Sequence, residues 1–123
     1  MCIVDEAAQC TEPQALIPLC LNPKLYILVG DSQQLEPTII SQVCKDEDYG
    51  RSLFERLESN RYTKFFLNIQ YRMRPEISLF PNNRFYKGLL RDSKSVSDPS
   101  YGNIFGSNTQ YRPYVFYDIS IVY

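Results

Sequence analysis

The chain has 123 residues, 44% of them hydrophobic, which is enough for one modest core and excludes a wholly disordered polypeptide. Its formal net charge of -1 gives no sign of a nucleic-acid partner in the bulk composition, although a local basic face stays open. No apolar run of about 18 residues is present, so no membrane span is expected.

The chain opens with an apolar strand that runs straight into two carboxylates. Ile3 and Val4 are followed by Asp5 and Glu6. Ligands of open α/β sheets lie at the carboxyl ends of the strands, so this pair stands where a substrate would bind. Such a pair suits a magnesium–phosphate site, in which one carboxylate holds the ion and the other orients or deprotonates water. The alternative is that both residues are solvated in a loop.

A short helix and a second strand follow. Thr11 and Gln14 have the spacing of a capping box, with Thr11 as N-cap, and Pro18 should kink or shorten the helix. The apolar run 25–29 is typical of a strand buried on both faces, and Asp31 comes soon after it. Two strands joined by a helix, each followed by an acidic residue, predict a βαβ unit with a shared functional edge.

The middle of the chain contains two more predicted elements between irregular stretches. Residues 32–50 are expected to be mostly irregular. Ser52 and Glu55 form a second capping-box spacing at the start of a helix. Residues 63–69 are a third strand candidate, and Pro75 is a natural first residue for the helix after it.

The last third of the sequence changes in character. Ile77, Phe80 and Phe85 would line the apolar face of the helix that begins at Pro75. Residues 90–113, rich in Ser, Asp, Asn, Gly and Tyr, are predicted to form a long surface loop. Residues 114–119 are a last strand candidate.

The cysteines predict buried thiols in a reducing compartment, because most of their neighbours are apolar. No pair has C-x-x-C spacing and the sequence contains no histidine, so a zinc site is not expected. The four residues are Cys2, Cys10, Cys20 and Cys44.

Three segments that follow apolar strands supply different chemical groups. Segment 5–8, DEAA, offers carboxylates for a metal ion and water. Segment 30–35, GDSQQL, offers a tight turn and the Gln34 amide, which can sense a phosphate oxygen. Segment 70–75, QYRMRP, offers the Arg72 guanidinium, which can neutralise charge developing on a phosphoryl group. Together they fit phosphoryl transfer from a nucleotide to water.

These segments resemble motifs II, III and IV of superfamily 1 helicases, and their order and spacing resemble the branch containing senataxin and the nonsense-mediated-decay RNA helicase. Segments 52–57 and 80–86 are also similar to that branch, so the resemblance covers roughly three quarters of the chain. It implies an α/β fold of paired RecA-like P-loop NTPase lobes, parallel sheets with flanking helices, with ATP between them. Residues 1–67 would form the C-terminal part of the first lobe and residues 68–123 the start of the second.

The resemblance implies roles for five side chains. Asp5 would help bind the magnesium ion, and Glu6 would activate the attacking water. Gln34 would contact the γ-phosphate and couple the nucleotide state to movement. Arg72 would reach the γ-phosphate from the second lobe, and Tyr71 would lie near the nucleotide.

Each role has a structural alternative. Arg72 could be a surface arginine capped by Glu76, Gln34 could cap a turn, and Tyr71 could pack in the core. Asp31 is expected to support the turn of its motif. Three further tyrosines could stack on bases or simply pack, namely Tyr62, Tyr86 and Tyr111.

The sequence departs from the family pattern in four places. Arg74 stands where a histidine is common, and Glu36 stands where a small or apolar residue is usual. The G-x-x-x-x-G-K-[ST] loop that cradles the β- and γ-phosphates is missing, as are the later motifs of the second lobe. Because the first residues already form a core strand, we expect the chain to be a fragment of something longer and inactive alone.

The sequence therefore predicts a fragment of an ATP-dependent helicase that uses ATP and Mg²⁺ and acts on single-stranded RNA or DNA, with RNA favoured. It would need the missing helicase regions for activity, and no membrane partner is expected. The expected location is intracellular, with the nucleus favoured over the cytoplasm. One alternative is a non-catalytic binding module that docks to helicase partners or nucleic acid, and another is a different P-loop NTPase.

Overall fold

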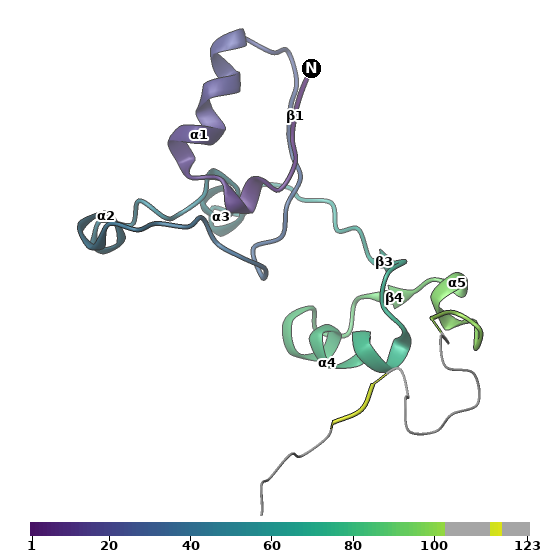
Figure 1. Cartoon of the computed structure of the whole chain (residues 1–123). Helices are drawn as coiled ribbons and strands as arrows, with labels where there is room; N and C mark the ends of the chain where they lie inside the picture. The colour runs from purple at the N-terminus through teal and green to yellow at the C-terminus, as the bar shows by residue number, and fades with distance from the viewer. Residues whose placement is uncertain (103–113, 117–123) are drawn as a thin grey trace, which may run out of the picture. The chain divides into compact units, whose positions relative to one another are not determined.

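A computed structural model describes residues 1–102 and 114–116 (Figure 1). The chain divides into two compact units, Met1–Phe65 and Phe66–Tyr123. The assignment of residues 1–67 and 68–123 to two helicase lobes stays a prediction. Each unit contains short parallel strands and helices, which confirms the predicted α/β class. None of the helices in the described part of the chain is long and apolar enough to cross a lipid bilayer.

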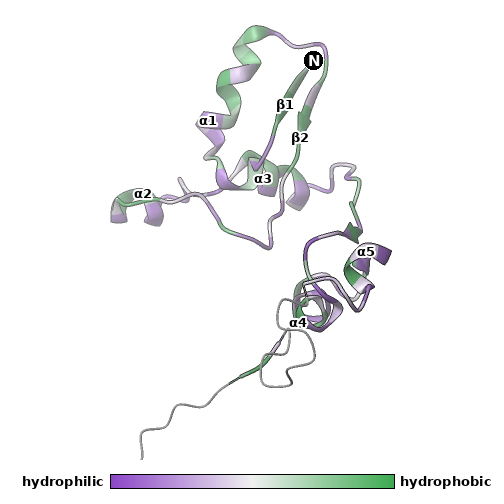
Figure 2. Cartoon of the chain, turned by 45° about the vertical axis from the view of Figure 1, so that its right-hand side comes forward, coloured by the Kyte–Doolittle hydropathy of each residue, from purple (hydrophilic) through white to green (hydrophobic). Residues whose placement is uncertain are grey.

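The first unit is built on two parallel strands, β1 (Cys2–Val4) and β2 (Tyr26–Leu28). They run side by side and are both largely apolar, as Figure 2 shows. Val4 lies opposite Leu28, and the Val29 amide nitrogen donates to the Val4 carbonyl oxygen at 2.8 Å. The predicted βαβ unit is therefore confirmed. The expectation that β2 is buried on both faces is wrong. Its residues are only half-buried, because the sheet in the described part of this unit has two strands.

The connection between these strands is helical along most of its length. The short 3₁₀ helix η1 (Ala7–Gln9) precedes α1 (Glu12–Leu16), and a second 3₁₀ helix, η2 (Ile17–Leu21), continues directly from α1. The predicted capping box is confirmed, because Gln14 Oε1 accepts from the Thr11 amide nitrogen at 2.9 Å. The predicted limit at Pro18 is also confirmed, since a proline ring cannot sit inside a regular α-helix without breaking a hydrogen bond.

Two further helices belong to the first unit. The short helix α2 (Gln42–Asp46) lies in the stretch that the sequence predicted as mostly irregular, and it begins at Ser41, whose hydroxyl accepts from the Cys44 amide. Helix α3 (Leu53–Ser59) begins as predicted at Ser52, whose Oγ accepts from the Glu55 amide nitrogen at 3.1 Å. The buried side chain of Leu53 anchors this helix.

An ion pair joins helices α1 and α3. The Arg56 guanidinium donates from Nε to Glu12 Oε2 at 2.8 Å and from Nη2 to Glu12 Oε1 at 2.6 Å. This two-pronged geometry fixes both the distance and the orientation of the two side chains. The hydrogen bonds from Arg56 hold the pKa of the Glu12 carboxyl below its usual value.

Glu58 ties the loop after β2 to helix α3 and to the end of the first unit. Its Oε2 accepts from Ser32 Oγ at 2.6 Å, and its Oε1 pairs with the Lys64 ammonium. The Lys64 and Ser32 hydrogen bonds lower the pKa of the Glu58 carboxyl below its usual value of 4.5.

The second unit repeats the strand–helix–strand arrangement. Strand β3 (Ile69–Gln70) pairs in parallel with β4 (Arg91–Asp92), and helix α4 (Pro75–Phe85) connects them. Helix α5 (Lys94–Ser97) follows β4. Pro75 occupies the first turn of α4 as predicted, and the chain turns after α4 through Gly88 at φ +73°.

The predicted strand 63–69 is wrong over most of its length. Residues 63–68 form no strand, and the side chains of Phe65 and Leu67 are 91% and 81% exposed. An apolar run becomes a strand only where a second strand pairs with it, and the parallel partner β4 reaches only Ile69–Gln70.

The predicted apolar face of α4 is also wrong, since Ile77, Phe80 and Phe85 are all exposed. The buried residue of this helix is Ser78, whose hydroxyl bonds to Asp92 on β4. The polar contact, and not the apolar spacing, decides which side of α4 faces the strands.

The predicted loop 90–113 contains two regular elements, β4 and α5. Ser93 is the N-cap of α5, and Val96 within it is fully buried, so a serine-rich composition concealed a short packed helix. Residues 103–113 lie outside the described residues. Of the last strand candidate, residues 114–116 are not in a strand and residues 117–119 lie outside the described part.

The prediction of buried cysteines is wrong as well. All four thiols are free, but Cys20 is exposed and the others are only partly covered.

We expect Gly30→Ala to destabilise the first unit by about 1–3 kcal/mol. A Cβ atom at Gly30 would stand 2.9 Å from the backbone nitrogen of Ala8, and a backbone atom cannot relieve the clash as a flexible side chain could. The measurement is urea unfolding followed by circular dichroism. Gly50→Ala is the matched control, because its Cβ would meet only the flexible Ile39 side chain at 3.3 Å. Equal effects of the two substitutions would contradict the prediction.

We expect the stability of the first unit to depend on pH through Glu58. Because folding lowers the pKa of this carboxyl, its stabilisation is present above pH 4.5 and is lost as the pH falls further. Glu58→Gln should cost about 0.5–1 kcal/mol above pH 4.5 and progressively less below it. Urea unfolding across this range tests the prediction, with Glu55→Gln on the same helix as the control. A Glu58→Gln deficit that does not change with pH would refute it.

Candidate functional site

The first two predicted site residues follow β1 on an unusual backbone. Glu6 has φ 50° and ψ 38°, a left-handed conformation that residues with a Cβ atom adopt at a cost. The Glu6 amide nitrogen donates to Asp5 Oδ1 at 3.0 Å, and the Gln9 amide nitrogen donates to the Glu6 carbonyl oxygen at 2.9 Å. Both carboxylates are exposed, as the metal-site interpretation and the solvated-loop alternative each require.

Asp31 organises the loop that follows β2. Its Oδ1 accepts from the Gln33 amide nitrogen at 3.0 Å, and its Oδ2 accepts from Gln34 Nε2 at 2.8 Å. The Gln34 amide nitrogen also donates to the Asp31 carbonyl oxygen at 3.2 Å. The expectation that Asp31 supports this turn is confirmed. Gln34 is exposed and takes part in the turn, and the Asp31 carboxylate fixes the orientation of its side-chain amide.

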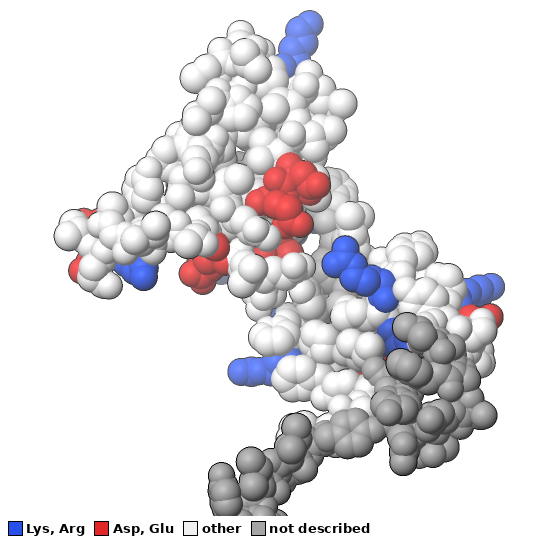
Figure 3. Space-filling model, viewed as in Figure 1, with Lys and Arg blue, Asp and Glu red and all other residues white. Residues whose placement is uncertain are grey.

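The two polar segments of the first unit come together at the carboxyl edge of its sheet. The Ala7 amide nitrogen donates to the Val29 carbonyl oxygen at 2.8 Å, so the chain after β1 turns across the end of β2. Gly30 lies against the backbone nitrogen atoms of Ala7 and Ala8. Figure 3 shows acidic side chains gathered on this part of the first unit. The structure therefore brings Asp5 and Glu6 to the same sheet edge as the Gln34 loop.

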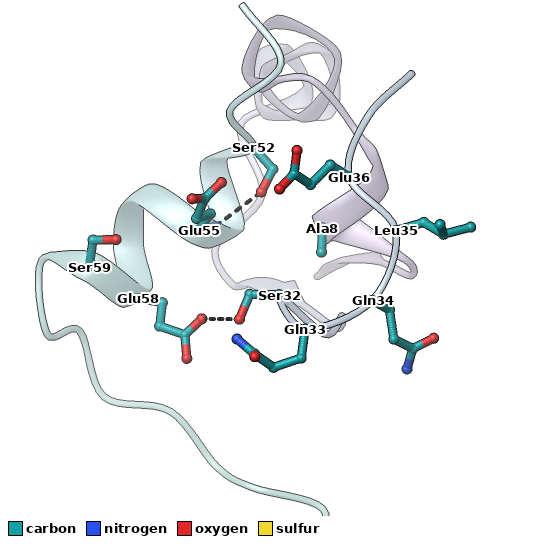
Figure 4. Close-up of a pocket in the computed structure, with 10 residues that line it drawn as sticks. All are labelled: Ala8, Ser32, Gln33, Gln34, Leu35, Glu36, Ser52, Glu55, Glu58 and Ser59. Atoms are coloured by element: carbon teal, nitrogen blue, oxygen red, sulfur yellow. Dashed lines mark hydrogen bonds between the residues drawn. The ribbon is translucent and has the colours of Figure 1, made fainter. Parts of the chain in front are cut away.

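A shallow pocket of about 260 Å³ lies between the Gln34 loop and helix α3 (Figure 4). Three carboxylates line it, from Glu36, Glu55 and Glu58, and no Lys or Arg does. Figure 4 shows the Gln34 side chain directed away from the other lining side chains. Negative charge on this lining disfavours a phosphate, so we do not assign the pocket as the nucleotide site.

A magnesium ion fits the first unit only with ligands from outside the protein. Within residues 1–102 and 114–116, no group of three or more Cys, Asp or Glu side chains could hold a metal ion. Mg²⁺ commonly binds through one or two carboxylates and takes its other oxygens from phosphates and water. The exposed Asp5 carboxylate at the end of β1 suits that arrangement.

The second unit presents Tyr71 and Arg72 on one tight turn after β3. Gln70 Oε1 accepts from the amide nitrogen atoms of Arg72 at 2.9 Å and Met73 at 2.7 Å, and Gln70 Nε2 donates to the Met73 carbonyl oxygen at 2.6 Å. The Tyr71 side chain is 66% exposed, so the alternative that it packs in the core is wrong.

The alternative for Arg72, a surface arginine capped by Glu76, is wrong in its partner only, since Arg72 does lie on the surface. Glu76 pairs instead with Arg74, with Arg74 Nε 3.2 Å from Glu76 Oε2, and the hydrogen bonds from Arg74 lower the pKa of the Glu76 carboxyl. Arg74 is thus a structural residue. Among the residues that the structure describes, the Arg72 guanidinium makes no ion pair, and Arg72 is exposed.

Sequence reasoning missed Gln70 and Tyr101 as residues that hold this turn. Tyr101 Oη donates to the Arg72 carbonyl oxygen at 3.0 Å, across 29 positions of sequence, and no local pattern signals such a contact. Gln70 was noted only as the first residue of segment 70–75, with no role assigned to it. Of the tyrosines proposed to stack on bases, Tyr86 lies against the Phe66 ring with centroids 6.4 Å apart, and Tyr111 lies outside the described residues.

The predicted site residues therefore form two groups, one in each unit. Asp5, Glu6 and Gln34 share a sheet edge in the first unit, and Tyr71 and Arg72 share a turn in the second. The first group can hold a cation, accept a proton from water and donate to an anionic oxygen. The second offers a guanidinium that makes no ion pair with any described residue, next to an exposed ring.

Comparison with known proteins gives consistent matches along the chain. Two family models, each described as an AAA domain, match residues 1–42 and 49–122. The probable helicase MAGATAMA 3 of Arabidopsis thaliana is 44% identical over 117 residues. In Saccharomyces cerevisiae, helicase SEN1 is 42% identical over 117 residues and the ATP-dependent helicase NAM7 is 42% identical over 101 residues.

These alignments cover 95%, 95% and 82% of the chain, but the chain spans only 14%, 5% and 10% of the three relatives. One of the two family models alone matches more than half of the chain, over residues 49–122. The chain belongs to the superfamily 1 helicases with RecA-like P-loop NTPase folds, in the branch of the SEN1-like and NAM7-like helicases.

Proposed function

We propose that this chain supplies part of the ATP-hydrolysis site of a helicase that acts on single-stranded nucleic acid. The residues it supplies would activate water, hold the cation, sense the phosphate and provide an arginine. The observation that supports this most is the shared sheet edge of the first unit, where two carboxylates and an oriented amide follow adjacent parallel strands. NAM7 is named an ATP-dependent helicase, which supports ATP as the substrate. RNA is the favoured strand, because the branch includes the nonsense-mediated-decay RNA helicase.

The carboxylates of the first unit take different roles in this proposal. Asp5 would hold the magnesium ion, and the hydrogen bond from the Glu6 amide nitrogen to Asp5 Oδ1 limits the side chain to few orientations. Glu6 accepts a proton from the attacking water through its exposed carboxylate. Bound Mg²⁺ offsets the charge of the phosphates that meet these carboxylates.

Gln34 and Arg72 complete the proposed machinery. The Asp31 carboxylate accepts from Gln34 Nε2, so the side-chain amide of Gln34 is oriented before it meets a γ-phosphate oxygen. Arg72, with no ion pair among the described residues, can neutralise charge that develops on the phosphoryl group. Tyr71 offers an exposed ring beside the nucleotide.

The rest of the helicase polypeptide would supply the phosphate loop. The 123 residues contain no G-x-x-x-x-G-K-[ST] sequence, so we propose that the chain alone has negligible ATPase activity. We also propose an intracellular location, in the nucleus rather than the cytoplasm. Four free cysteines support a reducing compartment.

We expect Glu6→Gln, in the helicase polypeptide that carries this segment, to lower kcat for ATP by roughly 10²–10⁴-fold. An amide cannot take the proton of the attacking water, but it keeps the shape of the side chain, so ATP binding should persist. Steady-state ATPase assays and nucleotide-binding titrations measure the two effects. Glu47→Gln, at the exposed end of α2, is the control.

Two results would contradict this assignment. Retained turnover in Glu6→Gln would show that Glu6 is not the general base. A helicase polypeptide that binds single-stranded RNA but has no turnover even without substitutions would favour the alternative, a non-catalytic binding module.

A further inference from the structure

We propose that Gln70 and Asp92 are positioning residues for Arg72, and that together they fix the backbone from which its guanidinium reaches the phosphoryl group. The inference rests on the proposed function through the role of Arg72, but the network itself lies wholly within the second unit. The inference gives a positioning role to Asp92 on β4, a residue that the sequence predicted to lie in a loop.

The Gln70 side-chain amide uses all four of its hydrogen-bonding positions. Its oxygen accepts from the amide nitrogen atoms of Arg72 and Met73, and its nitrogen donates to the Met73 carbonyl oxygen and to Asp92 Oδ1 at 2.6 Å. The opposite orientation would point NH₂ at two backbone N–H groups, so only one orientation fits. Because all four positions are bonded, the Gln70 side-chain amide determines the conformation of the turn that carries Arg72.

Asp92 orients Gln70 from the neighbouring strand. The two residues are register partners in the parallel pair of β3 and β4, so their side chains stand on the same face. Asp92 Oδ1 also accepts from Ser78 Oγ at 2.8 Å, and Ser78 on α4 is only 3% exposed. Asp92 is therefore anchored on one side by a buried hydroxyl while it holds the Gln70 amide on the other.

A second contact holds the other side of Arg72. Tyr101 Oη donates to the Arg72 carbonyl oxygen at 3.0 Å, and Arg74 Nη1 donates to the Tyr101 carbonyl oxygen at 2.5 Å. The amide nitrogen and the carbonyl oxygen of Arg72 are thus both bonded, while its side chain is exposed. Because the Arg72 backbone is fixed, only its side-chain torsions must become ordered when the guanidinium binds a negatively charged group. The entropy cost of that binding is therefore lower.

The first experiment measures amide hydrogen exchange in this chain. Asp92→Leu should accelerate exchange at Arg72 and Met73 by roughly tenfold or more, because Gln70 loses the acceptor that orients it. Asp92→Asn should leave exchange unchanged, since Asn Oδ1 accepts the same two hydrogen bonds. Gln70→Glu, which keeps the acceptor oxygen but faces Asp92 with a second carboxylate, should behave like Asp92→Leu.

Exchange at the amides of Arg91 and Ser93 reports whether the strand pair survives these substitutions. These amides donate to the carbonyl oxygen atoms of Asn68 and Gln70 at 2.7 and 3.0 Å. Faster exchange at Arg72 and Met73 with unchanged Arg91 and Ser93 supports the inference. Equal acceleration at all four amides, or none at Arg72 and Met73, overturns it.

The second experiment separates this inference from the proposed function. In the helicase polypeptide that carries this segment, Asp92→Leu should lower kcat by roughly 10–100-fold with the KM for ATP unchanged. Adding Asp92→Leu to Arg72→Ala should cause little further loss, because both act through one guanidinium. Asp46→Leu, on α2, is the matched control for loss of a carboxylate.

The outcomes are distinguishable. If Arg72→Ala itself leaves kcat unchanged, the proposed role of Arg72 fails, and the positioning inference fails with it as a functional statement. If Arg72→Ala lowers kcat while Asp92→Leu does not, the positioning inference alone is overturned.

Discussion

The close approach of two backbones at Gly30 is the constraint on which the candidate site of the first unit depends. The chain leaves β1, turns through the left-handed Glu6 and crosses the end of β2, where the Ala7 amide donates to Val29. At the crossing, a Cβ on Gly30 would come within 2.9 Å of the Ala8 nitrogen, so only glycine lets the two segments meet. The small alanines of segment 5–8 have the same explanation, since both are buried at this contact.

Both units fix their functional loops with side chains rather than with long strand ladders. Strand β2 has three residues and β3 has two, so few ladder hydrogen bonds hold the loops that follow them. In the first unit the Asp31 carboxylate bonds to the loop after β2, and in the second the Gln70 amide bonds to the turn after β3. In each case a polar residue at the end of a strand orients the residue with the proposed chemistry a few positions later.

The sequence predicted several features that depend on near neighbours, and it missed two that depend on distant ones. The caps at Thr11 and Ser52 and the helix start at Pro75 involve contacts within three residues, and all are present. Strand β4 (Arg91–Asp92) and the burial of Ser78 depend on partners from another part of the chain, and composition argued against both. The motif residues of the site were recognised because their spacing is local, whereas the network that holds Arg72 spans β3, α4 and β4.

The charge distribution within each unit explains why the proposed chemistry needs both a cation and a free arginine. The sheet edge of the first unit presents exposed carboxylates from Asp5 and Glu6, which repel a polyphosphate unless a divalent ion intervenes. In the second unit Glu76 is paired with Arg74, so it does not compete for Arg72, which makes no ion pair within residues 66–102 and 114–116. A hydrogen-bonded backbone with an unpaired guanidinium costs little reorganisation when negative charge develops, which is the condition for electrostatic stabilisation of a transition state.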